Sequence, residues 1–337
     1  MLTLLLAEQA VGAAGNGLEV PASFWVAFCA GTAILLVLDM FVFHRRAHEP
    51  TLRESALWTL FWCSLALAFN AWVWYWAGSF HAINFFTGYL VEWSLSMDNV
   101  FVFVVIFSYF GVPLKYQYRV LFWGILGAIV MRLTFILAAY QLLHRFEWIF
   151  YVFGAFLIYT GIKLASAHGA ETNPDQNIVL RFARRFLRVA KGSHGQKFFI
   201  RQDGRLYVTS LFLVLLVVES TDVVFAIDSV PAIFGITREP FIVFTSNVFA
   251  IMRLRALYFL LAGVMGLFRY LHYGLSAILI FIGVKMILHD FVHIKHWHSL
   301  LVIVALLAIA IVTSLMAARR ERRMILEGRV PPPPGAE

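Results

Sequence analysis

Nine long apolar stretches constrain this chain more than any other feature of its sequence. A helix of about 20 mainly apolar residues crosses the hydrocarbon core of a bilayer. The composition agrees, because 61% of the 337 residues are hydrophobic and 14% are charged, which is too apolar for a soluble globule. The sequence therefore predicts an all-α, polytopic membrane helix bundle of about nine transmembrane helices. We place them near residues 22–43, 55–78, 85–110, 118–143, 147–166, 207–236, 240–267, 273–290 and 298–317.

The basic residues gather mainly in a few segments between these stretches. The formal net charge is +8, and the clusters lie in "HRRAHEPTLRES", in residues 181–205 and in "ARRERRM" near the end. With nine helices, all three segments fall on one side of the membrane, as the positive-inside rule describes for the cytoplasmic side. We therefore expect a multi-pass protein with its N-terminus outside and its C-terminus in the cytoplasm. We expect the protein to contact the lipid bilayer and not to bind nucleic acid.

One basic segment, from about residue 168 to 206, has a helical pattern of its own. Arginines recur at helical spacing on one side of it, and apolar residues line the other. This is typical of an amphipathic helix on an anionic membrane surface, and a solvated basic loop explains it equally well. The arginines are Arg181, Arg184, Arg185 and Arg188, and the apolar residues are Val179, Phe182, Phe186 and Val189.

Three of the apolar stretches are repeated. The first copy runs from "EWSLSMDNVFVFVV" through "VMRLTFIL" to "YTGIKLA", and the second from "ESTDVVFAIDS" through "LRALYFLL" to "FIGVKMI". Because each copy has an odd number of helices, the second crosses the membrane in the opposite sense. This predicts an inverted three-plus-three repeat, the plan of many secondary transporters. The matched positions are Asp98 with Asp222, Arg132 with Arg255 or Arg253, and Gly161 with Gly283.

The repeat suggests a division of the chain into five parts. These are an N-terminal two-helix segment at 1–80, a first three-helix repeat at 85–166, a basic cytoplasmic loop at 167–206, a second three-helix repeat at 207–290, and a last helix with a basic, Pro-rich tail at 298–337.

Acidic side chains lie inside the first helix of each copy. An acid at mid-depth costs about 2.5–3.5 kcal/mol on insertion scales. Protonation, pairing with a base such as Arg132, or binding of a cation would each offset this. Two interpretations stay open, namely ion pairs that only determine helix packing and a path for a cation or proton. A further acid, Asp39, either lines that path or caps the cytoplasmic end of its helix near His44.

The acids of the second copy do not share one face of a straight helix. At about 100° per residue, Glu219 and Asp222 lie on one side, whereas Asp228 points to the side opposite Glu219. Proline disrupts the hydrogen-bond ladder of a helix. We therefore expect this helix to break near Pro231.

The polar residues of the two helices offer carboxylate and carboxamide oxygens. Such ligands suit hard cations such as manganese, magnesium or calcium, whereas copper and zinc favour thiolate and imidazole. We expect a divalent cation as substrate and no permanently bound cofactor. The predicted metal ligands are Glu92, Asp98, Asn99, Glu219, Asp222 and Asp228.

Acids within membrane helices also occur in intramembrane proteases, so an enzyme is a further alternative. The sequence has no HExxH motif, no GxSxG motif and no Gly-x-Gly-Asp at the second acid, which are the signatures such chemistry would need. We therefore expect no catalytic residues.

Several long motifs carry a resemblance to a known family. "EWSLSMDNVFVF", "LFLVLLVVESTDVVFAIDSVPAIFGIT", "FIVFTSN" and "LRALYFLLAG" resemble the TerC family, especially its Alx-type branch, over about residues 24–317. The resemblance implies a bacterial inner-membrane protein linked to tellurite resistance, with several members connected to manganese export and metal homeostasis. It also implies a fold near the LysE-type exporters and the same six polar positions. Arg253 departs from the family pattern, which usually has Gly there, and could pair with an acid.

Together these features predict a transporter that exports a divalent cation, manganese first, by alternating access. The cation would be held between the first helices of the two copies, and Asp228 would be the proton-coupled acid. The alternative is a membrane scaffold or redox-stress factor whose buried ion pairs are structural. A homo-oligomer is left open.

Overall fold

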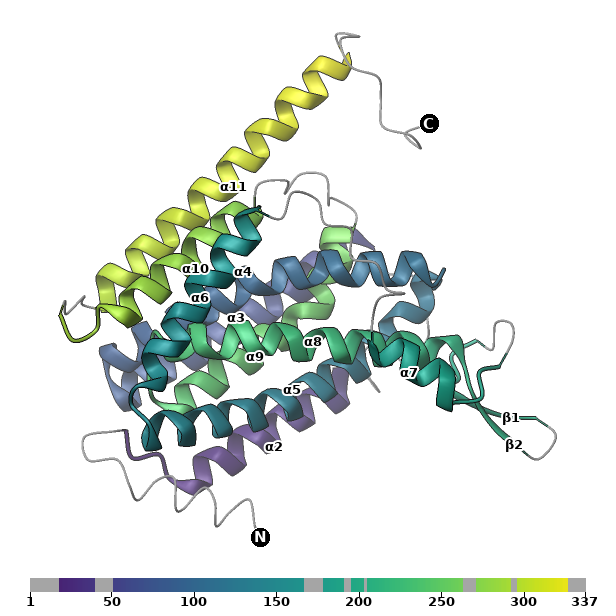
Figure 1. Cartoon of the computed structure of the whole chain (residues 1–337), viewed down its shortest axis with the longest axis horizontal. Helices are drawn as coiled ribbons and strands as arrows, with labels where there is room; N and C mark the ends of the chain where they lie inside the picture. Colours follow the sequence, from purple (N-terminus) through teal and green to yellow (C-terminus); the bar gives the residue numbers. More distant parts are fainter. Residues whose placement is uncertain are drawn as a thin grey trace.

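The computed structural model describes residues 18–39, 51–166, 178–190, 195–202, 205–262, 271–291 and 296–326. These residues form a bundle of helices with one short hairpin (Figure 1), which confirms the predicted all-α, polytopic membrane bundle. The helices are α2 (Ala22–Leu38), α3 (Leu52–Ala77), α4 (Ser79–Tyr109), α5 (Leu114–Arg145), α6 (Ile149–Ser166), α7 (Ile178–Phe186), α8 (Ser210–Phe234), α9 (Pro240–Ala262), α10 (Leu271–Ile287) and α11 (His296–Leu326). The antiparallel strands are β1 (Phe199–Gln202) and β2 (Arg205–Val208).

Seven of the described helices are long and apolar enough to cross a membrane. They are α3, α4, α5, α6, α8, α9 and α11, while α2 and α10 are apolar but shorter. Each of the nine predicted stretches therefore coincides with an apolar helix. The number that cross the bilayer, the repeat and the five-part division stay predictions.

Side-chain hydrogen bonds cap the first turns of two helices, α3 and α8. The hydroxyl of Thr51 accepts a hydrogen bond from the Glu54 backbone N–H at the start of α3, and Thr209 accepts one from Phe212 at the start of α8. Such caps satisfy backbone donors that have no partner inside the helix. Gly78, with φ +87°, makes the sharp turn between α3 and α4, a conformation that side chains disfavour.

The predicted break at Pro231 is wrong. Helix α8 runs without interruption through Pro231 to Phe234. Proline removes one backbone hydrogen bond and its ring crowds the carbonyl four residues earlier, but three more residues of α8 follow it in helical conformation. Asp228 consequently stays on a different side of α8 from Glu219.

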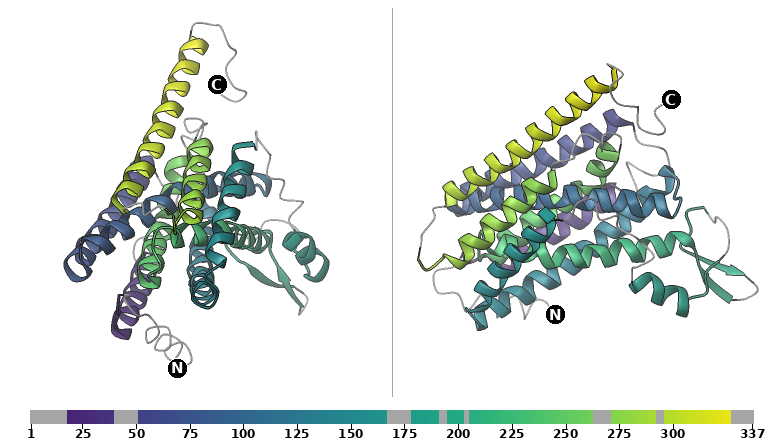
Figure 2. Two further views of the ribbon diagram at one scale, coloured as in Figure 1. Left: turned by 60° about the vertical axis from the view of Figure 1, so that its left-hand side comes forward. Right: turned by 45° about the horizontal axis from the view of Figure 1, so that its top comes forward.

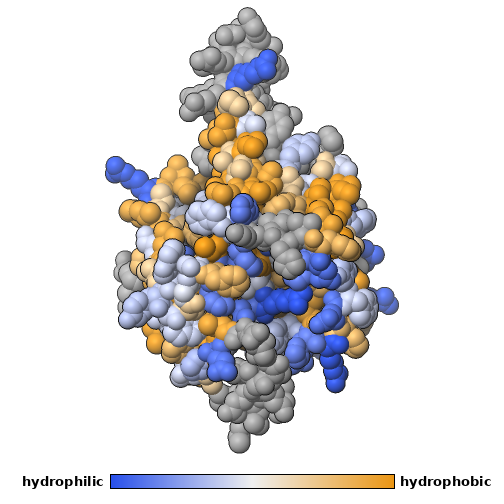
Figure 3. Space-filling view, turned by 90° about the vertical axis from the view of Figure 1, so that its left-hand side faces the viewer, coloured by the Kyte–Doolittle hydropathy of each residue, from blue (hydrophilic) through white to orange (hydrophobic). Residues whose placement is uncertain are grey.

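The helices form a buried centre with an apolar exterior. Helix α9 is wholly buried and α4 mostly so, whereas α3, α6 and α11 bury much smaller shares. Leu57, Tyr159 and Ile309 are each more than half exposed on these outer helices, as lipid-facing residues would be. Figure 3 looks onto one end of the bundle and shows hydrophilic residues over its middle with hydrophobic residues around them.

The third helices of the two predicted copies, α6 and α10, pack closely. A Cβ on Gly283 would lie 2.6 Å from the Gly154 carbonyl oxygen, and one on Gly161 would lie 3.0 Å from the Ser276 carbonyl oxygen. Gly283 thus faces Gly154, which stands seven residues before Gly161. In the same way, Gly161 faces Ser276, which stands seven residues before Gly283. Together with the contacts of α4 with α9 and of α8 with α5, this exchange is what two units related by a two-fold axis would show.

A polar contact also joins α6 to the turn that follows α10. The Tyr151 hydroxyl donates a hydrogen bond to Asp290, which His289 also contacts at 2.9 Å. These two interactions hold the pKa of Asp290 below its usual value.

Candidate functional site

A buried arginine joins four helices near the centre of the bundle. Arg132 of α5, 2% exposed, forms an ion pair with Glu92 of α4. Its Nη1 also donates hydrogen bonds to Ser229 Oγ at 3.0 Å and to Asn247 Oδ1 at 3.2 Å, and its Nη2 lies 3.6 Å from Asp222 Oδ1. We call these five residues the Arg132 cluster. Four helices therefore converge on one guanidinium.

The cluster holds two carboxyl groups and one guanidinium. Glu92 is fully buried and also accepts a hydrogen bond from Asn247 Nδ2 at 3.3 Å. With both carboxylates ionised, two negative charges face the single positive charge of Arg132. Asp222 Oδ2 is buried and has no hydrogen-bond partner among the described residues. A second cation would be electrostatically favourable here, because like charges in a low-dielectric interior repel strongly.

Glu219 lies beside the cluster, one turn before Asp222. It is half-buried and close enough to Asp222 for their charges to interact. A Cβ on Gly127 of α5 would overlap the Glu219 carboxylate. The glycine therefore provides the space that this acid occupies between α5 and α8.

The remaining predicted ligands do not join the cluster. Asn99 is buried in α4, and no hydrogen bond links it to the cluster within the described part of the chain. Asp228 is half-buried, and its electrostatic neighbour is Lys163 of α6. Asp98 belongs to α4, but its side chain lies outside the described residues.

The carboxylates are not arranged as a ready-made metal site. No group of three or more His, Cys, Asp or Glu that could hold a metal occurs among the described residues. Within the Arg132 cluster the reason is plain, since the guanidinium lies between Glu92 and Asp222. Metal binding by the six predicted ligands therefore stays a prediction.

Sequence reasoning did not assign a role to Asn247. It lies in "FIVFTSN", where Thr245, Ser246 and Asn247 are three consecutive polar residues in an apolar helix, and all three are fully buried. Buried polar groups need hydrogen-bond partners. That run was the available signal for a polar contact at this depth.

A second buried ion pair lies at Asp39. This acid pairs with Arg255 of α9, and the ring of Tyr118 lies 4.3 Å from the guanidinium carbon. Both charged side chains are nearly inaccessible. Asp39 therefore has a partner that neither sequence-based alternative named, and His44 lies outside the described residues.

Comparison with known proteins identifies the family. Residues 77–322 match the family described as Integral membrane protein TerC family. The chain belongs to the TerC family. An uncharacterized membrane protein of Myxococcus xanthus is 49% identical over 295 residues, covering 88% of this chain and 92% of that protein. The Escherichia coli (strain K12) protein named "Putative membrane-bound redox modulator Alx" is 46% identical over 297 residues, covering 86% and 92%.

A similar protein also occurs in a third bacterium. An uncharacterized membrane protein of Rickettsia felis is 39% identical over 292 residues, covering 87% of this TerC-family chain and 97% of that protein. No solved structure matches the chain. Membership of the TerC family establishes a multi-pass integral membrane protein in contact with the lipid bilayer.

Arg253 of α9 has an unusual environment. Arg253 is fully buried, with its guanidinium carbon 5.3 Å from the Tyr89 ring centre and 4.7 Å from that of Trp93. Its Nη1 donates to Cys63 Sγ at 3.4 Å, and Tyr89 donates to the same sulfur at 3.4 Å. No described carboxylate contacts Arg253, so the expected pairing with an acid is not seen there.

This environment predicts that Arg253 contributes little to stability. Cation–π contacts stabilise by up to about 2 kcal/mol each when desolvated, but burying a cation without an anion costs several kcal/mol. Its Nε and Nη2 also have no described partner. Arg253→Met should therefore change the free energy of unfolding by less than about 1 kcal/mol, measured by thermal or denaturant unfolding in detergent. A loss of several kcal/mol would show that an anion pairs with Arg253.

Proposed function

We propose that this TerC-family protein exports a divalent cation, with Mn²⁺ the first candidate, by alternating access. The observation that carries the proposal is that two buried carboxyl groups of the Arg132 cluster share one guanidinium. Glu92 and Asp222 come from the first helices of the two predicted copies, and one guanidinium is shared between them. In inverted-repeat transporters, substrate sites lie where such equivalent helices meet.

Arg132 acts in this proposal as an internal counter-ion. In the absence of substrate, the guanidinium compensates one of the two buried carboxylate charges. A divalent cation competes with the guanidinium for the same oxygen atoms, and Ser229 and Asn247 supply further oxygen ligands of the kind that hard cations prefer. The guanidinium thus lowers the electrostatic cost of the empty site, which would otherwise hold two uncompensated acids.

The other acids have subsidiary roles in the proposal. Two of them, Glu219 beside Asp222 and Asp98 in α4, are further oxygen ligands of the cation. Asp228 is the proton-coupled acid, with Lys163 as its electrostatic neighbour. We place the protein in the bacterial inner membrane with its N-terminus outside and its C-terminus in the cytoplasm, following the positive-inside rule.

A second candidate is a membrane scaffold or redox-stress factor, and two observations favour it. The Arg132 cluster is an ion-paired network without a described metal-ligand group. In addition, the Cys63 thiol is contacted by Arg253 and Tyr89, and some TerC relatives carry the name redox modulator. Under this candidate the buried ion pairs have a structural role only.

Transport by purified protein in liposomes separates the two candidates. Wild-type protein should take up Mn²⁺ saturably, and Asp222→Asn should reduce the rate at least about tenfold, because one of the two buried carboxylates loses its charge. This variant should still fold, since Glu92 continues to pair with Arg132. Thr313→Ala is the control, because the Thr313 hydroxyl bonds to the carbonyl oxygens of Ile309 and Ala310 in its own helix, α11, away from the Arg132 cluster.

The outcomes are distinct. Saturable uptake in wild type and the control, but not in Asp222→Asn, supports the transporter. Folded wild-type protein that moves neither Mn²⁺ nor Mg²⁺ or Ca²⁺ contradicts it and favours the scaffold or redox role.

A further inference from the structure

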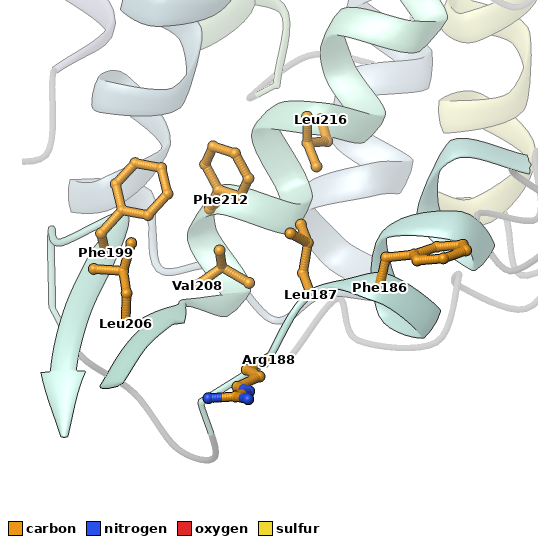
Figure 4. A pocket seen from close by; sticks show the side chains of 8 residues that line it. All are labelled: Phe186, Leu187, Arg188, Phe199, Leu206, Val208, Phe212 and Leu216. Carbon is orange, nitrogen blue, oxygen red and sulfur yellow. The ribbon is translucent and has the colours of Figure 1, made fainter. Parts of the chain in front are cut away.

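An apolar groove opens at the end of the bundle where α7 and the hairpin lie. It has a volume of about 580 Å³ and is lined by residues from α7, the segment after it, both strands and the first turns of α8. Figure 4 shows Leu187, Phe199, Phe212 and Leu216 around it, with Arg188 at its edge. A groove of this size is within the range of small-molecule and cofactor sites. Its lining, however, is almost wholly apolar.

We propose that this groove binds an anionic phospholipid, with an acyl chain in the apolar groove and the phosphate at the basic rim near Arg188. The proposal concerns a lipid site separate from the Arg132 cluster and does not depend on the transported substrate. Three features of the surrounding structure carry it: the depth of the groove along α8, its exposed apolar walls and the charge of its rim.

The groove lies at the depth of the membrane boundary. Its lining residues Phe212 and Leu216 are in the first two turns of α8, a candidate membrane span that begins at Ser210. Leu216 stands six residues after Ser210, which is about 9 Å along the helix axis. Interfacial helices bury their apolar faces about 5–10 Å into the boundary between headgroups and acyl chains. The groove therefore spans the layer in which a phospholipid changes from polar to apolar.

The walls of the groove are preformed and expose apolar surface. The Arg188 carbonyl accepts a hydrogen bond from Val208 N at 2.9 Å, which ties the segment after α7 to β2. The ring of Phe199 lies 4.7 Å from that of Phe212 and joins β1 to α8. Even so, Phe199 is 49% exposed and Leu206 is 65% exposed. In water such surface would be unfavourable, whereas a lipid chain would cover it.

Arg188 lines the groove, and the part of the chain that forms the groove is strongly basic, as binding of an anionic headgroup requires. Between residues 176 and 218 the sequence has a single acid, Asp203, against eight basic residues. Arg181, Arg185 and Arg188 are exposed on α7 and just after it. Basic residues near an anionic membrane contribute about 1 kcal/mol each to binding. The eight basic residues are Arg181, Arg184, Arg185, Arg188, Lys191, Lys197, Arg201 and Arg205.

The position of the groove explains why a lipid fits better than a soluble ligand. Helix α7 and the hairpin project from one end of the bundle, at the opposite end from the C-terminal ends of α5 and α10 (Figures 1 and 2). A groove beside the first turns of a membrane span faces lipid on one side and headgroups on the other. A phospholipid is the ligand that has both characters.

Native mass spectrometry of the full chain in detergent tests the proposal, with titration of phosphatidylglycerol and phosphatidylcholine. Wild type should bind phosphatidylglycerol at least about fivefold more tightly than phosphatidylcholine, which is the equivalent of one basic contact. Arg188→Gln should remove most of this preference. Leu216→Trp, which fills the groove, should weaken binding of both lipids. Arg145→Gln is the control. It also removes one arginine charge, but Arg145 lies in the last turn of α5, at the end of the bundle away from the groove.

Further variants keep the test decisive. If Leu216→Trp does not fold, Leu206→Ser at an exposed position of β2 replaces it and should weaken both lipids. Equal affinity for the two lipids, or unchanged binding in the groove variants, overturns the proposal. So does full competition by glycerol phosphate, which would show a site for the headgroup alone. A dimer of the chain that disappears in the groove variants would assign the groove to a second copy instead.

Discussion

Arg132→Met should lower the free energy of unfolding by about 3–5 kcal/mol, the cost of removing one partner from a buried ion pair. The reason lies in the partners left behind. Glu92 is fully buried and depends on Arg132 for its charge compensation, and Asp222 lies 3.6 Å from the same guanidinium. Methionine fills part of the space but donates no hydrogen bond, so Ser229 and Asn247 also lose a contact.

A double-mutant cycle identifies the cause. Glu92→Gln in the Arg132→Met background should recover a large part of the lost stability, because the uncompensated charge is removed. Denaturant unfolding in detergent, followed by circular dichroism, measures each variant. If Arg132→Met costs less than about 1 kcal/mol, the range of an exposed ion pair, the cluster is not a buried charged network. Arg253→Met provides the comparison with a buried arginine that no described carboxylate contacts.

Gly283→Ala should destabilise the protein by about 2–3 kcal/mol, through overpacking of α10 against α6. The added Cβ would lie 2.6 Å from the Gly154 carbonyl oxygen and 2.8 Å from Ile158 Cγ1. Because the nearest atom belongs to the backbone, rotation of a side chain cannot relieve the contact. The two helices must move apart, and the hydrogen bond from Ser276 Oγ to the Gly161 carbonyl oxygen, 2.5 Å long, should weaken with them.

Gly31→Ala is the matched control for this prediction. It makes the same change inside α2, where a Cβ would have no neighbour within 4 Å. Alanine is favoured over glycine within a helix by about 0.5–1 kcal/mol, so the control should leave the unfolding temperature unchanged or raise it. Equal effects of the two substitutions would contradict close packing between α6 and α10.

The positions of the membrane helices could be predicted from the sequence, because length and apolar composition act locally. A stretch of about 20 apolar residues satisfies its own backbone as a helix whatever surrounds it. The amphipathic pattern of residues 178–186 is local in the same sense, and α7 forms there. The sequence also indicated that acids inside such helices need compensation, since the cost of burying a charge depends little on the fold.

The partner of each buried charge was decided only by the tertiary structure. Sequence spacing places Glu219 and Asp222 on one side of α8. It does not predict which basic residue of another helix faces them. The predicted repeat matches Arg132 with Arg255 or Arg253. Arg132 meets Glu92 and Asp222, whereas Arg255 meets Asp39 and no described carboxylate contacts Arg253. Contacts between helices far apart in the chain set these pairings, so residue type and spacing alone leave them open.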